Sequence, residues 1–248
     1  MKLKLTLLLL LVLGIIILKV DDNNYSVLLD DKIIETNYII PKIIFQTYHT
    51  KTKIPTYVIE NTKNYAKTYN INILDDIDGL QFLKQYYTHD VVNKYDSLKG
   101  PHKADLLRYC LLYIHGGVYA DIKTVFIKDL ENIINNTKNN NHKIYTVNSY
   151  IGGTTYQGFI ATTPRNPLFL NLIKHILNTP ILRTYIDYLV FCRYIDTELK
   201  NVKDQDIILF NEICTSDSDK KDKYGLYCKI NDNDDTHIID TRDPNYPY

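Results

Sequence analysis

The chain has 248 residues, a length that suits one domain with a substantial core and short appendages. Its 29 basic and 29 acidic residues cancel, so no overall positive field favours nucleic acid or an anionic surface as a partner. Four cysteines are too few for a disulfide scaffold, although Cys214 and Cys228 flank a polar loop and are able to pair in an oxidising compartment.

The first element is an apolar segment at the amino terminus. Lys2 and Lys4 precede an uncharged run at residues 5–18 that is shorter than the roughly 20 residues of an ordinary spanning helix. No small-residue cleavage site follows, and the leading lysines favour a cytoplasmic amino terminus. We therefore expect residues 1–20 to be an uncleaved signal-anchor of a single-pass protein with a luminal domain, joined to it by a polar stalk at 21–38. The alternative is a cleaved signal peptide, which would give a secreted protein.

Short strands and helices follow over residues 41–98. Apolar runs bounded by turn signals predict strands at 41–48 and 71–74, and helical patterns predict helices at 54–69 and 80–87. Residues 91–98 lead into the next helix. The acidic turn at 75–79 lacks the later glutamate of a calcium loop. We expect this turn to be solvated and to cap the helix after it.

Residues 103–123 (KADLLRYCLLYIHGGVYADIK) are the most informative stretch of the chain. Apolar side chains from Leu106 to Ile114 follow a 3.6-residue period, which predicts a buried helix. Gly100-Pro101 suits the start of this helix and Gly116-Gly117 suits its end.

A short strand is predicted directly after these glycines. Its alternation places Val118, Ala120 and Ile122 on one face and Tyr119, Asp121 and Lys123 on the other. Polar groups at the carboxyl end of a strand lie where open α/β sheets bind their ligands.

Asp105 and Arg108 are three residues apart on the predicted helix, so their side chains share one face. A surface ion pair explains this spacing, and the carboxylate would also be favourable near the positive amino-terminal end of the helix. On the residues alone, this ion pair is the simpler interpretation.

The second half of the chain continues with apolar and helical segments. Strands are predicted at 144–147 and 207–210, and helices at 168–177 and 183–199. Further apolar segments lie at 124–127, 156–162 and 238–239, and polar loops at 135–142 and 217–223. No phosphate-binding glycine loop, zinc pattern or nucleophile–base motif is present in the sequence.

The stretch around residues 104–121 resembles the DXD-containing glycosyltransferases of family 32, whose motif also occurs in the large clostridial glucosylating toxins. The matching residues are Ala104-Asp105, Arg108-Tyr109, Gly116-Gly117, Tyr119 and Asp121. Lys123 departs from the family, which has its second aspartate there. On the first strand Gln46 matches, while Phe45 and Tyr48 stand where the family has histidine and tryptophan.

This resemblance implies a fold and an activity. The fold would be an α/β, GT-A-like (Rossmann-related) nucleotide-sugar-binding domain with a mixed central sheet. Its catalytic core would span residues 39–177, and residues 178–248 would form an extension that completes the domain. The activity would be the transfer of a sugar from a nucleotide-sugar donor to a glycan or glycoprotein acceptor, with retention of anomeric configuration.

The resemblance also implies roles for individual residues. Catalytic roles fall to Asp105, Arg108, Asp121 and Lys123. Binding of the nucleotide sugar falls to Gln46, Tyr48, Asp105, Arg108, Gly117, Tyr119 and Asp121.

Lys123 makes the need for a divalent cation uncertain. In the family two aspartates and one divalent cation cancel in charge, and here one aspartate and one lysine cancel without a cation. The Lys123 ammonium is therefore expected to take over part of the cation's role toward the diphosphate. Alternatively, Asp121 holds Mn²⁺ or Mg²⁺ with a ligand from Asp234, Asp235 or His237.

Two other functions stay open at the level of sequence. The chain is either an enzyme or a non-catalytic relative that binds a nucleotide sugar or glycan after loss of the second aspartate. A third possibility is a secreted structural protein that uses the fold as a scaffold only.

Overall fold

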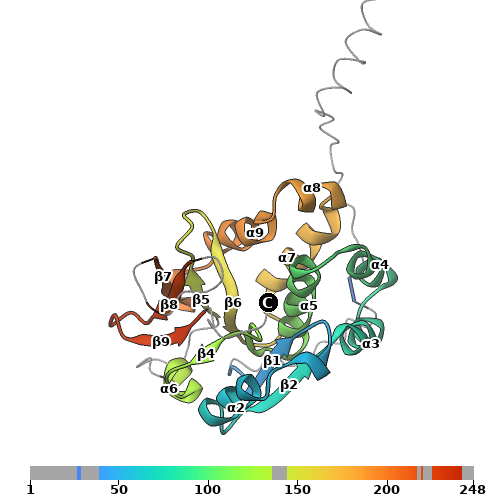
Figure 1. Ribbon diagram of the computed structural model, residues 1–248. Coiled ribbons are helices and arrows are strands. Elements are labelled where there is room, and N and C mark those ends of the chain that lie inside the picture. The colour runs from blue at the N-terminus through green and yellow to red at the C-terminus, as the bar shows by residue number, and fades with distance from the viewer. Residues whose placement is uncertain (1–26, 29–38, 136–143, 217–218, 220–224, 242–248) are drawn as a thin grey trace, which may run out of the picture.

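The structure is a computed structural model that describes residues 27–28, 39–135, 144–216, 219 and 225–241 (Figure 1). The expected signal-anchor, most of the stalk and most of the two polar loops lie outside these residues. Among the residues described, no helix is long and apolar enough to cross a membrane.

One mixed sheet of nine strands organises the described part of the chain, in the order β2-β1-β3-β6-β5-β7-β8-β9-β4. The strands are β1 (Ile43–Thr47), β2 (Asn70–Leu74), β3 (Gly117–Ala120), β4 (Val125–Phe126), β5 (Ile144–Asn148), β6 (Thr155–Thr162), β7 (Ile207–Thr215), β8 (Tyr227–Asn231) and β9 (His237–Asp240). β1 pairs in parallel with both β2 and β3, whereas β3 pairs antiparallel with β6. The predicted α/β class with a mixed central sheet is confirmed.

Helices cover both faces of this sheet (Figure 1). They are η1 (Lys51–Lys53), α2 (Thr56–Tyr65), α3 (Asp76–Tyr86), α4 (His89–Ser97), α5 (Pro101–His115), α6 (Leu130–Asn135), α7 (Pro167–Asn178), α8 (Ile181–Ile186), α9 (Val190–Leu199) and η2 (Asp204–Asp206). The expected cap on α3 is present, because the Asp75 carboxylate accepts hydrogen bonds from the N–H groups of Ile77 and Asp78.

Alternation along the strands divides the core into two apolar clusters. Phe45 and Tyr119 face the cluster built on α5 and α7, while Val118 and Ala120 face the cluster that contains Leu130 of α6. The alternation predicted from Val118 to Ala120 is therefore confirmed, and both faces of β3 are buried.

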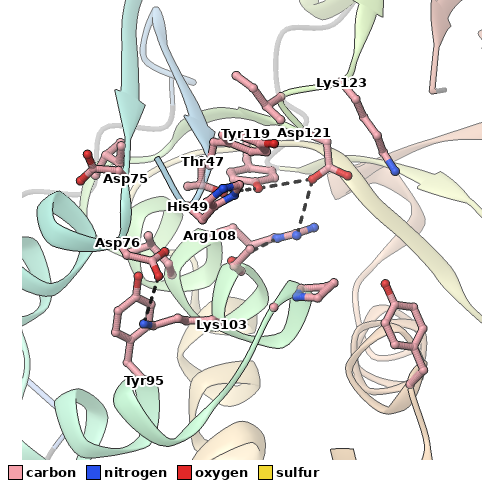
Figure 2. Close-up of a pocket in the computed structure, with 18 residues that line it drawn as sticks. Thr47, His49, Asp75, Asp76, Tyr95, Lys103, Arg108, Tyr119, Asp121 and Lys123 are labelled. Carbon is pink, nitrogen blue, oxygen red and sulfur yellow. Dashed lines mark hydrogen bonds and ion pairs between the residues drawn. The ribbon is translucent and has the colours of Figure 1, made fainter. Parts of the chain in front are cut away.

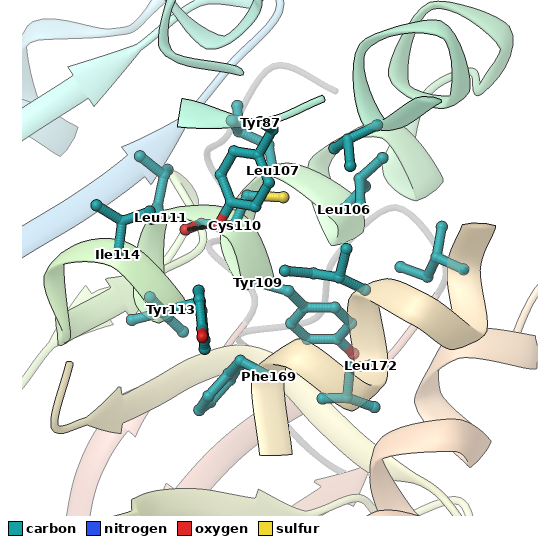
Figure 3. Packing of buried hydrophobic residues seen from close by; sticks show 14 of the residues in the cluster. Tyr87, Leu106, Leu107, Tyr109, Cys110, Leu111, Tyr113, Ile114, Phe169 and Leu172 are labelled. Atoms are coloured by element: carbon teal, nitrogen blue, oxygen red, sulfur yellow. Dashed lines mark hydrogen bonds between the residues drawn. The ribbon is translucent and has the colours of Figure 1, made fainter. Parts of the chain in front are cut away.

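Helix α5 is the centre of the larger cluster (Figure 3). Every residue from Asp105 to Ile114 is buried, so this helix is enclosed on all sides rather than amphipathic. Phe169 and Leu172 of α7 pack against it, and the Tyr87 hydroxyl donates a hydrogen bond of 2.7 Å to the Cys110 carbonyl. A helix held in this way is a rigid base for side chains at its amino-terminal end.

The glycine pair after α5 sets how closely β3 approaches its neighbours. Gly116 and Gly117 have φ angles of +62° and +88°, values that glycine adopts without strain. A Cβ atom on Gly117 would lie 2.6 Å from the Ile43 carbonyl oxygen, and one on Gly116 would lie 2.5 Å from the Pro164 nitrogen. Glycine is thus required on both conformational and steric grounds.

The predicted strand at 118–123 is wrong in its last three residues. β3 ends at Ala120, and Asp121 to Lys123 belong to a turn in which the Thr124 N–H donates to the Asp121 carbonyl at 2.9 Å. The turn forms because the backbone leaves the sheet after Asp121, whose N–H still donates to Gly158 of β6 at 2.8 Å.

The predicted single helix at 183–199 is also wrong, because α8 and α9 are separate. The chain breaks at Asp187, whose carboxylate accepts from the Leu189 N–H at 3.2 Å and pairs with Arg183 and Arg193. An aspartate that hydrogen-bonds to the backbone two residues further on offers the chain an alternative to a continuous helix, which favours a break.

Strands β7, β8 and β9 add the carboxyl-terminal part of the chain to the same sheet. β8 had no clear signal in the sequence. Cys214 of β7 and Cys228 of β8 occupy directly opposed positions and form a disulfide bond.

Candidate functional site

The carboxyl ends of three parallel strands meet at one edge of the sheet, as the topology of open α/β sheets leads one to expect. A cavity of about 570 Å³ lies there, and its walls come from the ends of β1, β2 and β3 and from the first turns of α5. Figure 2 shows polar side chains from these separate elements facing the same space.

Arg108 lies at the centre of this wall. Its Nη2 atom is 3.1 Å from Oδ1 of Asp105 and 3.6 Å from Oδ1 of Asp121. Its Nη1 donates to the Gln157 carbonyl at 2.6 Å, and its guanidinium carbon lies 4.5 Å from the centre of the Tyr119 ring. The guanidinium is therefore fixed by two carboxylates, a carbonyl and an aromatic face.

Asp121 lies at the mouth of the cavity, and 25% of its side chain is exposed. The Tyr119 hydroxyl donates to its carboxylate at 3.3 Å and shares a 2.8 Å hydrogen bond with Thr47. The Gln46 amide donates to the Asp121 carbonyl at 3.5 Å. The carboxylate is thus oriented from β1 and β3 together while part of it stays accessible to a ligand.

The electrostatics of the group follow from its burial. Burial raises the pKa of Asp105 above its ordinary value, and the neighbouring Arg108 charge opposes part of that rise. The pKa of Arg108 is raised because the nearby tyrosines and carboxylates outweigh the effect of burial, so the guanidinium stays charged. Burial also raises the pKa of Tyr119, so its hydroxyl remains protonated and able to donate.

The structure places the predicted site residues in two groups. Those that line the cavity are Tyr48, Arg108, Tyr119, Asp121 and Lys123. Asp105 lies behind Arg108 with only 8% of its surface exposed, and Gln46 and Gly117 are buried behind the wall. Asp105 and Asp121 nevertheless contact the same Arg108 nitrogen, so both carboxylates belong to one cluster.

Other residues of the wall were not identified from the sequence. His49, Asp76, Lys103 and Tyr188 all line the cavity, and Lys103 lies 3.3 Å from the Asp76 carboxylate. Asp76 had a usable signal, because it follows directly on a predicted strand whose carboxyl end faces the site. Tyr188 had none, since it reaches the cavity from the break between α8 and α9.

The described residues do not surround Asp121 with ligands for a cation. Among them, three potential ligands come together only at Glu212, Cys214 and Cys228, and the two cysteines are joined in the disulfide. Asp235 accepts from Asn231 instead, and His237 contacts Asp240 at 2.8 Å. Asp234 lines a different cavity, and none of the three residues lines the Asp121 cavity. The side chains on this wall therefore do not fit a cation held by the protein alone.

Comparison with known proteins supports the resemblance on which this site was predicted. Residues 24–140 match the family described as glycosyltransferase sugar-binding region containing DXD motif. The initiation-specific alpha-1,6-mannosyltransferase of Saccharomyces cerevisiae is 28% identical over 102 residues, which are 37% of this chain and 21% of that protein. This chain thus matches about a fifth of the length of that relative.

A solved structure, the PaToxG glycosyltransferase, aligns with 65% of this chain and 69% of its own, at 18% identity and a TM-score of 0.48. The residues that carry the family motif are the ones that line or support the cavity. Residues 24–140, a little under half of the chain, are thus similar to the glycosyltransferase sugar-binding region with the DXD motif, and Lys123 stands where that motif has its second aspartate.

Proposed function

We propose that the protein is a glycosyltransferase that moves a sugar from a nucleotide-sugar donor to a glycan or glycoprotein acceptor. The observation that carries this proposal is the convergence of Arg108, Tyr119 and Asp121 on one cavity at the carboxyl ends of three parallel strands. A site of this kind combines aromatic faces, a fixed positive charge and an oriented carboxylate, which together suit a nucleotide sugar.

Each side chain has a distinct task in this proposal. Asp121 accepts hydrogen bonds from hydroxyl groups of the nucleotide sugar, because part of its carboxylate faces the cavity. Arg108 acts mainly through its charge and by orienting the carboxylates, since most of its N–H groups are already engaged within the protein. Tyr48, whose ring centre lies 4.2 Å from that of His49, offers an aromatic surface to the base.

Transfer breaks the bond between the anomeric carbon and the diphosphate oxygen, and a new bond to an acceptor hydroxyl oxygen forms. The acceptor proton is released, and the nucleoside diphosphate leaves with the electron pair. The added negative charge on the leaving oxygen requires a positive group nearby. Figure 2 shows Lys123 on the same side of the cavity as Asp121, where its ammonium can meet the diphosphate. Retention of configuration is proposed from the family resemblance alone.

The test is turnover of the full chain with a panel of nucleotide sugars. At least one donor should release its nucleoside diphosphate, slowly without acceptor, and Asp121→Ala should abolish that release. Asp204→Ala is a matched control, because Asp204 is an exposed acidic residue that does not line the cavity. Release that survives Asp121→Ala would contradict the proposal.

The second candidate is a binding-only relative, and the presence of Lys123 at the last motif position favours it. Such a protein would show a rise in melting temperature with one nucleotide sugar and no release of the diphosphate. The same panel therefore separates the two functions.

A further inference from the structure

Helix α8 carries an apolar face that points away from the protein. Leu182, Tyr185 and Ile186 are 68%, 64% and 71% exposed, and Tyr188 just beyond the helix is 63% exposed. Positions 182, 185 and 186 lie on one side of a helix because they are three and four residues apart. The opposite side packs inward through Thr184, which is 8% exposed. The outward side of a helix on a water-exposed surface is normally polar, so the apolar outward side of α8 is the reverse of the usual arrangement.

The described chain begins close to this helix. Val27 is buried, and its carbonyl accepts a 3.0 Å hydrogen bond from the N–H of Thr88, the residue that caps α4. Further along α4, the Lys94 ammonium donates to the carbonyl of Thr179, two residues before α8. Thr88 and Lys94 are about 9 Å apart along the helix axis. Val27 and the segment before α8 therefore both contact α4, so the two lie near each other.

The sequence before Val27 limits how far the domain can be from the apolar run at 5–18. Only residues 19–26 separate them, and a fully extended chain of that length spans about 30 Å. A globular domain of this size is about 45 Å across. If the apolar run is held in a bilayer, the surface around Val27 has to face that bilayer.

We propose that the apolar face of Leu182, Tyr185 and Ile186, together with Tyr188, lies in the interface of the membrane that holds residues 5–18. Two aliphatic side chains beside two tyrosines match the composition that favours the boundary between headgroups and acyl chains. Arg183 and Arg193 both form ion pairs with Asp187, which offsets part of their positive charge. The contact of this face with the membrane therefore depends on burial of apolar side chains more than on charge. This orientation also brings the rim of the cavity formed by Tyr188 next to the headgroups. The proposal does not depend on sugar transfer.

The chain contains no tryptophan, so a single introduced tryptophan can report on this face. The full chain with Tyr185→Trp is reconstituted in phosphatidylcholine vesicles, with and without brominated acyl chains. Tyr57→Trp is the matched control, because Tyr57 is 41% exposed and belongs to α2, which lies at the opposite end of the molecule from α8 in Figure 1. We expect brominated lipid to quench the fluorescence of the Tyr185→Trp protein at least about twofold and to leave that of the Tyr57→Trp protein unchanged.

A second variant separates docking of this face from tethering by the amino-terminal segment. Adding Leu182→Ser and Ile186→Ser to Tyr185→Trp should abolish the quenching while the protein still floats with the vesicles. Equal quenching of the Tyr57→Trp and Tyr185→Trp proteins, or protein that does not float, would overturn the proposal. A concentration-dependent blue shift of Tyr185→Trp fluorescence in detergent, without quenching in vesicles, would also overturn it and assign the face to a second copy.

Discussion

Arg108 is the residue on which both carboxylates of the site depend. Asp105 and Asp121 come from different elements, and each is within ion-pair distance of the same guanidinium nitrogen. The Arg108 side chain is only 5% exposed, so solvent does little to screen these contacts. Its removal would leave a buried carboxylate at Asp105 without a counter-charge.

We predict that Arg108→Met lowers the free energy of unfolding by about 3–5 kcal/mol, the usual cost of breaking a buried ion pair from one side. Chemical denaturation of the full chain measures this change. Arg183→Met is the matched control, because Arg183 is 55% exposed in its own ion pair and should cost less than about 1 kcal/mol. Equal losses in the two variants would contradict the central position given to Arg108.

Lys123 allows a test, at a single position, of the proposal that its ammonium takes the place of a divalent cation at the diphosphate. We predict that turnover by the natural chain resists chelators, because the lysine already supplies positive charge at the diphosphate. Lys123→Asp restores the second aspartate of the family and should make turnover depend on added Mn²⁺. Initial rates with chelator and with Mn²⁺ measure both effects. Loss of activity of the natural chain in chelator, with recovery in Mn²⁺, would show that Asp121 recruits a cation despite Lys123.

His115 provides a prediction on pH. Its ring lies among those of Phe45, Phe82 and Tyr86, and burial together with the charge of Arg165 lowers its pKa below the ordinary value of 6.5. A lowered pKa means that the unfolded chain binds the proton more tightly, so stability is present above pH 6.5 and falls as the pH drops below it. The free energy of unfolding of His115→Gln should therefore fall less between pH 7.5 and pH 5.5 than that of the natural chain. The exposed His89→Gln is the control, and an unchanged slope in His115→Gln would contradict the prediction.

At the scale of elements, the corner between α5 and β3 fixes where Tyr119 and Asp121 lie. The sequence predicted this corner well, because the apolar period of α5, the glycine pair and the alternation of β3 are all local signals. It did not predict that β3 ends at Ala120, because the turn depends on contact with β6. Local patterns also missed the break at Asp187, whose carboxylate pairs with Arg193 of the next helix in addition to its local contacts with Arg183 and the Leu189 N–H.

We predict that Gly117→Ala weakens both stability and donor binding. Any residue with a side chain is strained at a φ of +88°, by about 1–3 kcal/mol, and the new Cβ would also meet the Ile43 carbonyl. β3 would have to shift, and Asp121 would shift with it. Gly153→Ala is the control, because Gly153 has a φ of +69° but nothing within 4 Å of the added Cβ. Thermal unfolding and donor titration of both variants measure the difference, and an equal effect on donor binding would contradict the role of the corner.

At the scale of the whole molecule, the site exists because distant segments meet at one edge of the sheet. Arg108 of α5 and Tyr119 of β3 could be predicted as wall residues, because they belong to one continuous motif. The contribution of Tyr188 could not, because it depends on the packing of the α8–α9 break. Asp76 had a signal in its place after a predicted strand, but its position in the wall depends on the pairing of β1 with β2. The sequence therefore indicated the chemistry of the site, whereas the shape of the cavity required the tertiary structure.

The disulfide and the sheet extension belong to the same scale. Cys214 and Cys228 were expected to be able to pair, and the register of β7 with β8 places them opposite each other. That register could not be derived from the sequence, because β8 had no recognisable pattern of its own.

Titration calorimetry of the full chain with nucleoside diphosphate sugars tests whether this cavity binds a donor. We expect at least one donor to bind and the isosteric Asp121→Asn to weaken its binding at least about tenfold, or about 1.4 kcal/mol. Asp204→Asn should leave the affinity unchanged. If no nucleotide sugar binds, or if Asp121→Asn binds as tightly as the natural chain, the cavity at the ends of β1, β2 and β3 is not a nucleotide-sugar site.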